Sequence, residues 1–507
     1  MNKKTIKLLE NEYWWGGIVS DGYLMPMGDT DLKRDLKKDH KSNQVSPFLV
    51  SNKGRYIYGY DPFTYEFKNR VLYIESEREI DFGEGYETLR GAYMAACQKH
   101  FPPNGKTPDS LMFTSPQYNA WIEMMYEPTG DKMVDYAKSI IKNGMPTGVI
   151  MIDDNWQEDY GVWRFHEGRF PEPKKTIDIL HSLGFKVMLW VCNYFSPDSY
   201  TFRELEQKGY LVKDKNGGSA IVHWWNGYSG LLDLTNSDAV EWLKGIFDEL
   251  MDKYGIDGFK FDAGDADVCS DDFITARKIS GTEYCKLWAE FGENYNLNEF
   301  RACYDMGGRA LAQRLCDKKH SWSKENGVAS LVPNGLAQGI TGYAYNCPDM
   351  IGGGEFSCFL DNPDLDEEIV VRYAQCAALF PMMQFSVSPW RILSKKHLDC
   401  CVEAAKLHHD RGDEIFKLAV EASATGEPIM RYMEYVFPNC GYEKVTDQFM
   451  LGNDILVAPI TEKNTYSRSV VFPKGTWQGE KDCITGPCEK EISAPIDTLL
   501  WFRKVEN

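Results

Sequence analysis

The 507-residue sequence has no run of about 18 consecutive apolar residues, which a membrane-spanning helix would need. Its first stretch, MNKKTIKLLENEYWWGG, lacks the apolar core of a signal peptide. Basic residues are not in surplus either, since the net charge is −19. A chain this acidic is not expected to bind nucleic acid, which requires a basic surface. We therefore expect a protein of the cytoplasm whose partners include neither a membrane nor a nucleic acid.

Metal-ligand spacings are missing as well. The 14 cysteines form no CxxC pair, which argues against both a metal centre and a secreted disulfide framework. A phosphate loop, an HExxH motif and a GxGxxG motif are absent, so the sequence predicts no cofactor. Free thiols fit a reducing cytoplasm. The sequence is compatible with a homo-oligomer.

Three regions differ in their hydrophobic pattern. Residues 1–105 alternate short apolar stretches with turn signals, which predicts a β-rich N-terminal domain. Residues 106–415 alternate apolar strands with amphipathic helices, and about eight such units predict a (β/α)8 TIM barrel. The alternative is a doubly wound open sheet. Residues 416–507 return to short strands between Gly, Pro and Asn turns, which predicts a C-terminal β-sandwich domain.

Carboxylates follow several of the predicted barrel strands. Asp153 and Asp154 follow the strand TGVIMI, Asp262 and Asp265 follow GFKF, and Asp305 follows FRACY. A single aspartate at such a position often caps the next helix. Several together indicate a functional site, because barrel enzymes carry their chemistry at the C-terminal ends of the strands. Asp317 follows GGRALAQRLC, which we read as a short helix.

Lys260 is unusual in the middle of an apolar strand. Alternation along the strand places Lys260 and Asp262 on one face and Phe259 and Phe261 on the other. A neighbouring cation would keep Asp262 ionised and available as a nucleophile. The alternative is a buried Lys–Asp pair without chemistry. Paired carboxylates in a chain with 14 Trp and no cofactor motif point to glycoside cleavage.

These motifs together resemble glycoside hydrolase family 31, the retaining α-glycosidases. GIDGFKFDAGD resembles the family's strand-four motif W-x-D-M-N-E, and RACYDMGGRALAQRLCDKKHSW resembles its R-S-x5-G-R-x6-G-D-N segment. PDMIGGG, DQFMLGNDILVAPI and FPKGTW resemble its later motifs. The resemblance implies Asp262 as nucleophile, Asp317 as acid/base, and Arg301 and Trp225 as sugar-binding residues.

Two departures bear on specificity. Lys260 stands where the family has an aromatic residue, and FPMMQFS lacks the family's sugar-binding histidine. These features resemble the α-galactosidase-like branch of the family, where K-F-D-A-G and P-D-M-I-G-G recur. A lysine also removes a flat wall and supplies up to three donors for an axial hydroxyl. WWGGIVSDG, with Asp21, resembles a loop that closes the pocket in this branch. Alternatively, it is a Trp-rich strand and turn that packs against the barrel.

The expected function is thus a retaining, exo-acting α-glycoside hydrolase, most consistent with an α-galactosidase, that acts on a small-molecule or oligosaccharide α-glycoside. Asp317 should have a raised pKa if it is to donate a proton near neutral pH. Three alternatives stay open: an α-glucosidase or transglycosylase of the same family, a noncatalytic sugar-binding protein, and an α-galactosidase of a different clan. The further substrate-binding residues expected are Lys260, Asp153, Asp154, Trp190, Trp121, Asp265 and Asp21.

Overall fold

The computed structural model describes residues 1–39, 44–360 and 362–505. Its centre is one eight-stranded sheet in which every neighbouring pair of strands is parallel. The two strands at the edges of this sheet are Asn346–Cys347 and Gln384–Phe385. A parallel bridge between Met350, just after the former, and Gln384 of the latter nearly closes the sheet, so the predicted TIM barrel is confirmed. In chain order the strands are β9 (Gln117–Asn119), β10 (Val149–Ile152), β13 (Lys186–Val191), β17 (Gly258–Phe261), β18 (Leu297–Phe300), β20 (Gln313–Arg314), β21 (Asn346–Cys347) and β22 (Gln384–Phe385).

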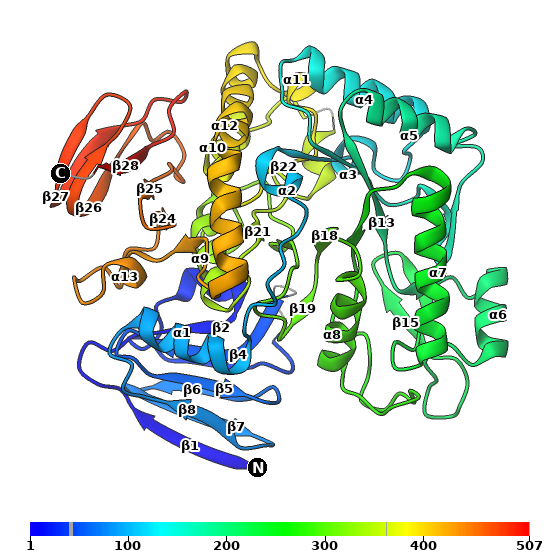
Figure 1. Cartoon of the computed structure of the whole chain (residues 1–507), viewed down its shortest axis with the longest axis horizontal. Coiled ribbons are helices and arrows are strands. Elements are labelled where there is room, and N and C mark those ends of the chain that lie inside the picture. The colour runs from blue at the N-terminus through cyan, green and yellow to red at the C-terminus, as the bar shows by residue number, and fades with distance from the viewer. Residues whose placement is uncertain (40–43, 361, 506–507) are drawn as a thin grey trace.

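Helices cover the outside of the barrel (Figure 1). The strands are buried on both faces, which explains why VIMI and KVMLWV read as nearly continuous apolar runs. The principal helices are α4 (Gly130–Lys142), α5 (Pro173–Ser182), α7 (Ser237–Tyr254), α8 (Gly281–Gly292), α9 (Leu331–Ile340), α10 (Glu367–Ala377) and α12 (Lys395–Thr425).

The predicted helix GGRALAQRLC is wrong, and beyond Phe300 the predicted strand FRACYDM is a strand only at Cys303–Tyr304, which is not part of the barrel. The fifth barrel strand is β18, which ends at Phe300, and residues 301–312 contain no helix. Within them, β19 (Cys303–Tyr304) leaves the barrel and pairs in parallel with β4 (Gln44–Ser51) of the N-terminal domain. The sixth strand, β20, then begins at Gln313, where a helix was expected.

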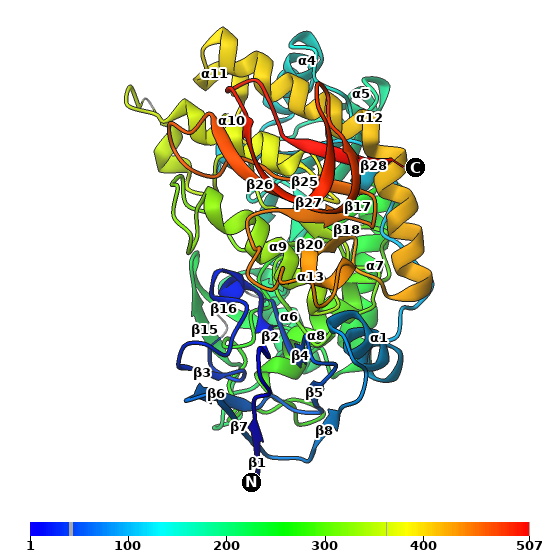
Figure 2. The same cartoon turned by 90° about the vertical axis from the view of Figure 1, so that its left-hand side faces the viewer.

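The N-terminal domain contains two sheets below the barrel (Figure 2). One has the order β1-β7-β6-β3, and the other joins β19, β4, β5 and β8, with β2 paired to β4. Helix α1 (Leu89–His100) follows them. The remaining strands of these two sheets are β1 (Asn2–Lys7), β2 (Trp14–Ile18), β3 (Leu32–Asp35), β5 (Tyr56–Gly59), β6 (Thr64–Lys68), β7 (Val71–Ser76) and β8 (Ile80–Gly83).

The C-terminal domain is an antiparallel β-domain, as predicted, with six strands joined in one sheet. In Figure 1, α12 stands between this sheet and the barrel. Because α12 runs to Thr425, the predicted boundary at residue 415 lies inside a helix. The strands are β23 (Met430–Arg431), β24 (Phe449–Leu451), β25 (Ile455–Val457), β26 (Ser467–Gln478), β27 (Cys483–Ser493) and β28 (Trp501–Val505).

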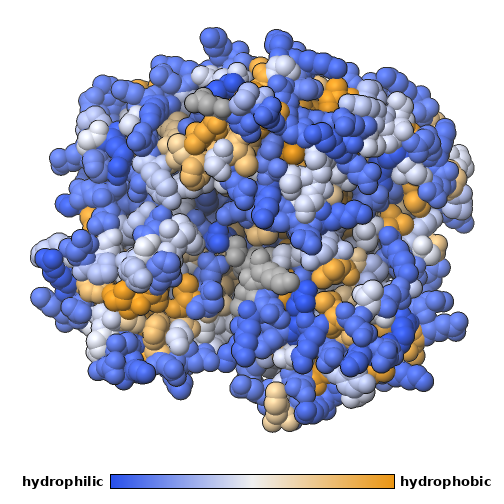
Figure 3. Space-filling view, turned by 180° about the vertical axis from the view of Figure 1, so that it is seen from behind, coloured by the Kyte–Doolittle hydropathy of each residue, from blue (hydrophilic) through white to orange (hydrophobic). Residues whose placement is uncertain are grey.

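The face opposite to that of Figure 1 is largely hydrophilic, and its apolar side chains are scattered in small groups (Figure 3). Within residues 1–39, 44–360 and 362–505, no helix is both long and apolar enough to cross a membrane.

Candidate active site

A cavity of about 530 Å³ opens where the barrel strands end. Every predicted site residue except Asp265 and Asp21 lines it. Its lining residues are Trp121, Asp153, Asp154, Trp190, Trp225, Lys260, Asp262, Arg301, Arg314, Asp317, Met350, Gly354, Glu355, Phe356 and Ser357.

Asp262 lies directly after β17, and the predicted alternation along this strand is confirmed. Phe259 and Phe261 point outward and stack on Phe247 and Phe300 respectively, while Lys260 and Asp262 face the cavity. The indole of Trp190 donates to Asp262 Oδ2 at 2.7 Å, and the backbone N–H of Ala263 donates to Oδ1 at 2.9 Å. Both carboxylate oxygens are therefore fixed in position.

The turn after Asp262 has a backbone conformation that few side chains adopt. Ala263 has a φ of 58° and Gly264 a φ of 74°. A Cβ atom on Gly264 would lie 2.3 Å from the ring of Trp288, whose indole N–H donates to the Asp262 carbonyl at 3.1 Å. Positive φ at a non-glycine residue costs about 1–3 kcal/mol and concentrates at functional sites. Here it turns the chain so that the Asp262 side chain faces the cavity.

Electrostatics favour the charged form of Asp262. Burial raises the pKa of its carboxyl, but the positive charges of Arg301, Lys260 and Arg314 together with the Trp190 hydrogen bond outweigh burial, so the pKa lies below its usual range. An ionised carboxylate is the form that a nucleophile requires.

Arg301, immediately after β18, lies between three carboxylates. Its Nε is 3.3 Å from Asp265 Oδ2 and 3.7 Å from Asp262 Oδ1, while Nη1 is 3.3 Å from Asp317 Oδ2. Its guanidinium also stacks over the Trp225 ring at 4.8 Å. Asp265 is therefore a support for Arg301 behind the cavity. Burial raises the pKa of Asp265, which Arg301 lowers only in part.

Asp317 differs from its predicted state. Burial alone would raise the pKa of its carboxyl, but Arg314 and Arg301 hold it well below the usual range. Arg314 Nη1 donates to Asp317 Oδ1 at 2.6 Å, although the Asp317 side chain is 49% exposed. The structure therefore departs from the expectation of a raised pKa, because the sequence did not reveal the second arginine.

Lys260 and Asp153 form an ion pair in the buried part of the cavity. Lys260 Nζ lies 2.7 Å from Asp153 Oδ2, and both side chains are at most 5% exposed. Burial lowers the pKa of Lys260, but Asp153 outweighs it and the net pKa is raised, so the ammonium stays charged. The pair places a donor and an acceptor side by side.

Asp154 belongs to a second polar group next to that pair. Tyr160 Oη and Asn226 Nδ2 each donate to Asp154 Oδ2 at 2.9 Å. Burial and the neighbouring Asp153 raise the pKa of Asp154 to about 7 in spite of the Tyr160 hydrogen bond. Its protonation therefore changes within the neutral range.

Arg314 is the main site residue that the sequence analysis missed. It is buried on β20, and its Nη1 donates at 2.5 Å to Asp349 Oδ1 as well as to Asp317. Its Nε lies 3.5 Å from Glu299. The only feature of the sequence that pointed to Arg314 was its position three residues before Asp317. Because we expected a helix there, we did not expect Arg314 to face the cavity. Asp349 lies within the quoted motif PDMIGGG.

Two aspartates lie elsewhere. Asp21 is buried and accepts both Nε and Nη2 of Arg34, at 2.5 and 3.1 Å, so it is not brought into the cavity. Asp305 follows β19 and not a barrel strand, and it accepts hydrogen bonds from Tyr58 and Lys286. It was expected at the barrel mouth and that expectation is wrong.

Among the described residues, no cluster of three or more His, Cys, Asp or Glu side chains is arranged to hold a metal ion.

Comparison with known families gives two matches along the chain. Residues 115–396 match the model described as the glycosyl hydrolases family 31 TIM-barrel domain. Residues 426–504 match the glycosyl hydrolase family 31 C-terminal domain.

Curated relatives resemble the chain over most of its own length. Mouse myogenesis-regulating glycosidase is 30% identical over 398 residues, which cover 76% of this chain and 55% of that protein. The sulfoquinovosidase of Escherichia coli is 26% identical over 371 residues, covering 68% and 53% respectively. The chain therefore spans about half the length of these relatives.

Solved structures share the fold. A Flavobacterium johnsoniae GH31 dextranase in complex with glucose superposes with a TM-score of 0.85 at 20% identity, covering 99% of this chain and 66% of that one. A GH31 sulfoquinovosidase from E. rectale gives 0.83 at 18% identity, covering 100% and 82%.

Proposed function

The chain belongs to glycoside hydrolase family 31, a family of retaining glycosidases, and we propose that it is an exo-acting α-glycoside hydrolase with a preference for α-galactosides. The observation that carries the proposal is a single cavity that holds Asp262, Asp317 and the Lys260–Asp153 pair. The first two supply the carboxyl groups for double displacement, and the pair supplies polar contacts for the sugar.

Asp262 is the proposed nucleophile. Its carboxylate attacks C1 of the α-linked sugar, and the bond from C1 to the leaving oxygen breaks as a covalent β-glycosyl-enzyme forms. Trp190 and the Ala263 N–H hold the carboxylate in one orientation, while the nearby arginines keep it ionised. Fixed orientation of this kind reduces the entropic cost of reaching the transition state.

Asp317 is the proposed acid and base. It gives its proton to the leaving oxygen and then takes one from the water that attacks C1, so the configuration at C1 is retained. In the unliganded site, Arg301 and Arg314 hold Asp317 in its charged form. We expect the entering sugar to weaken the 3.3 Å contact with Arg301 and to exclude water, which would raise the pKa of Asp317 toward the working range.

The preference for galactose rests on the buried part of the cavity. A sugar with an axial hydroxyl needs space and a polar partner for that hydroxyl. A sugar whose hydroxyl is equatorial can instead pack against a flat aromatic wall. Lys260 provides up to three donor hydrogens and Asp153 an acceptor 2.7 Å away. Trp121, Trp190 and Trp225 would provide the apolar surfaces for the ring faces.

A panel of aryl α-glycosides tests the proposal. We expect the α-galactoside to be cleaved with the highest kcat/KM, ahead of the α-glucoside, α-xyloside and α-sulfoquinovoside. A faster α-glucoside would favour the alternative of an α-glucosidase or transglycosylase, an activity named for two curated relatives, an alpha-glucosidase and an isomaltosyltransferase. Binding without cleavage of any substrate would indicate a noncatalytic sugar-binding protein.

A further inference from the structure

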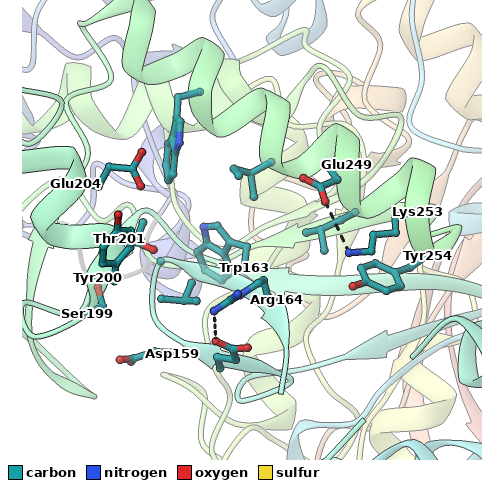
Figure 4. A pocket seen from close by; sticks show the side chains of 16 residues that line it. Asp159, Trp163, Arg164, Ser199, Tyr200, Thr201, Glu204, Glu249, Lys253 and Tyr254 are labelled. Carbon is teal, nitrogen blue, oxygen red and sulfur yellow. Dashed lines mark hydrogen bonds and ion pairs between the residues drawn. The ribbon is translucent and has the colours of Figure 1, made fainter. Parts of the chain in front are cut away.

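A second cavity, of about 540 Å³, is lined in part by the β11–β12 hairpin (Figure 4). The hairpin consists of β11 (Gln157–Asp159) and β12 (Val162–Phe165). The start of α6 (Tyr200–Lys208) and α7 from Trp242 to its end complete the walls. The two cavities share no lining residue. A volume of this size is typical of small-molecule sites and holds one or two sugar units.

Aromatic rings from all three elements line this second cavity. Tyr200 projects from α6 and is 78% exposed, so most of its ring is free to contact a ligand. Trp242 and Tyr254 come from α7, and Trp163 lies buried in the middle of the view in Figure 4. The Trp163 indole N–H is buried and has no hydrogen-bond partner within the described chain. Because Trp163 is 4% exposed and stacks on Trp156, the rings that can offer a flat surface to a sugar are those of Tyr200, Trp242 and Tyr254.

Four acidic and two basic residues line the cavity, and each acidic residue except Asp159 belongs to an ion pair. The two pairs drawn in Figure 4 each join residues on the same wall. A third glutamate, Glu204 on α6, pairs with Lys208 one turn further along that helix. The hydroxyl groups of Ser199, Tyr200 and Thr201 lie beside them. The paired charges and hydroxyls provide many donors and acceptors, and the carboxylate of Asp159 is one further acceptor. The pairs are Glu158–Arg164 (2.7 Å), Glu249–Lys253 (3.9 Å) and Glu204–Lys208 (2.6 Å).

We propose that this cavity is a second carbohydrate-binding site that holds one or two units of a neutral oligosaccharide. Aromatic surfaces combined with paired polar groups suit an uncharged polyhydroxylated ligand, and the excess of carboxylates disfavours an anion. The site goes beyond the proposed activity and does not depend on which glycoside the catalytic cavity cleaves. Its ligand would lie against the hairpin whose Tyr160 reaches Asp154 on the catalytic side.

Calorimetric titration with raffinose, a neutral trisaccharide, tests the site. Raffinose carries an α-galactosyl group that the proposed activity would cleave, so every titration uses the Asp262→Asn background. In that background we compare the otherwise unchanged chain with Tyr200→Ala and with Trp242→Ala. Tyr200 is so exposed that its loss leaves the fold intact even if the Trp242 variant is unstable. The matched control is Tyr73→Ala, which removes an exposed ring from β7 of the N-terminal domain.

The expected result is a raffinose-binding event that both cavity variants weaken at least about fivefold and that Tyr73→Ala leaves unchanged. The kcat/KM for the best aryl glycoside should stay the same in Tyr200→Ala. The proposal is overturned if no binding event responds to Tyr200→Ala, or if tetramethylammonium binds at this cavity and raffinose does not. Failure of the proposed glycosidase activity would show separately, as an absence of hydrolysis in the aryl glycoside panel.

Discussion

Lys260 connects the specificity of the site with its stability. Its ammonium is buried and is paired at 2.7 Å with Asp153, which is equally buried. Removing one partner of such a pair leaves the other charge buried without compensation, whereas replacing both partners by apolar residues is often neutral. The same lysine is also the residue that distinguishes this cavity from one with an aromatic wall.

We expect Lys260→Met to lower the free energy of unfolding by about 3–5 kcal/mol, because Asp153 is left unpaired. Urea denaturation measures this change, and the activity ratio between aryl α-galactoside and α-glucoside should fall. The double variant Lys260→Met/Asp153→Leu should recover most of the stability but not the ratio. Lys253→Met is the matched control, since its ion pair is exposed and should change stability by at most about 1 kcal/mol. An unchanged activity ratio in Lys260→Met would contradict the role assigned to this residue.

Asp262→Asn should reduce kcat on the aryl α-galactoside by about three orders of magnitude or more, because an amide cannot form the glycosyl-enzyme. The fold should persist, since the Asn oxygen can still accept the Trp190 indole N–H. Steady-state kinetics and the melting temperature measure the two effects. Near-normal turnover in this variant would rule out the assigned nucleophile.

Arg314→Gln should move the alkaline limb of the kcat/KM profile to higher pH. Asp317 must be protonated to donate, so activity falls as the pH rises through its pKa. Arg314 lowers that pKa through a 2.6 Å contact, and its removal should raise it by about 1–3 units. Arg309→Gln is the control, because Arg309 pairs with Glu293 outside the cavity. If the alkaline limb does not move in Arg314→Gln, the deprotonation that causes this limb is not that of Asp317.

The sequence could predict Asp262, Lys260 and Arg301 because each follows from a strand pattern or a long motif. It could not predict that Arg314 contacts Asp317, because that contact depends on how β20 enters the barrel. It also placed Asp21 in the pocket. The structure shows Asp21 paired to Arg34 on β3, a contact that exists only in the folded domain.

At the scale of elements, the errors arose where buried strands carry polar residues. β18 reads LNEF, and its Asn298 and Glu299 are buried although they are polar. A hydrophobic pattern therefore favours the next apolar stretch, FRACY, which leaves the barrel. β20, β21 and β22 have two residues each, too few for periodicity to detect. The longer strands β10, β13 and β17 were predicted correctly because they are long enough and apolar enough for the pattern to detect.

The β11–β12 hairpin supports the catalytic cavity through Tyr160, which donates a hydrogen bond to Asp154. Tyr160→Phe removes the 2.9 Å hydrogen bond to Asp154 and should raise the pKa of Asp154 above about 7. A smaller fraction of Asp154 is then ionised at neutral pH, so KM should rise about threefold to tenfold, with kcat little changed. Because higher pH restores the carboxylate, KM should recover as the pH rises from 7 to 8.5.

Tyr228→Phe is the control for this measurement, since Tyr228 is an exposed tyrosine on the nearby strand β16 (Gly227–Leu231). A rise in KM that does not depend on pH would mean that Tyr160 acts through packing and not through the charge of Asp154.

At the scale of the whole molecule, the N-terminal domain takes part in the construction of the active site. The side chain of Gln44, at the start of β4, donates from Nε2 to the carbonyl oxygen of Arg301 at 2.8 Å and also to that of Arg314. Its Oε1 accepts from Gln338 of α9 at 3.0 Å. One buried amide therefore joins the N-terminal sheet to the backbone of both arginines that hold Asp317.

This connection could not be predicted from the sequence. The hydrophobic patterns predicted three regions, and the alternation of strands and helices predicted the barrel, although its fifth and sixth strands lie elsewhere than expected. Gln44 and Arg301 are 257 positions apart, however, and neither periodicity nor a motif relates them. The parallel pairing of β19 with β4, which brings the two segments together, appears only in the folded chain.

We expect Gln44→Leu to leave two buried carbonyl groups without their donor, at a cost of about 1–3 kcal/mol in the free energy of unfolding. The loss should also free the backbone at Arg301 and Arg314, so that kcat/KM falls about tenfold or more while the variant remains folded. Denaturation and kinetics are compared with Gln98→Leu, an exposed glutamine on α1 of the same domain. If Gln44→Leu loses stability but keeps full kcat/KM, the N-terminal domain stabilises the barrel without positioning its arginines.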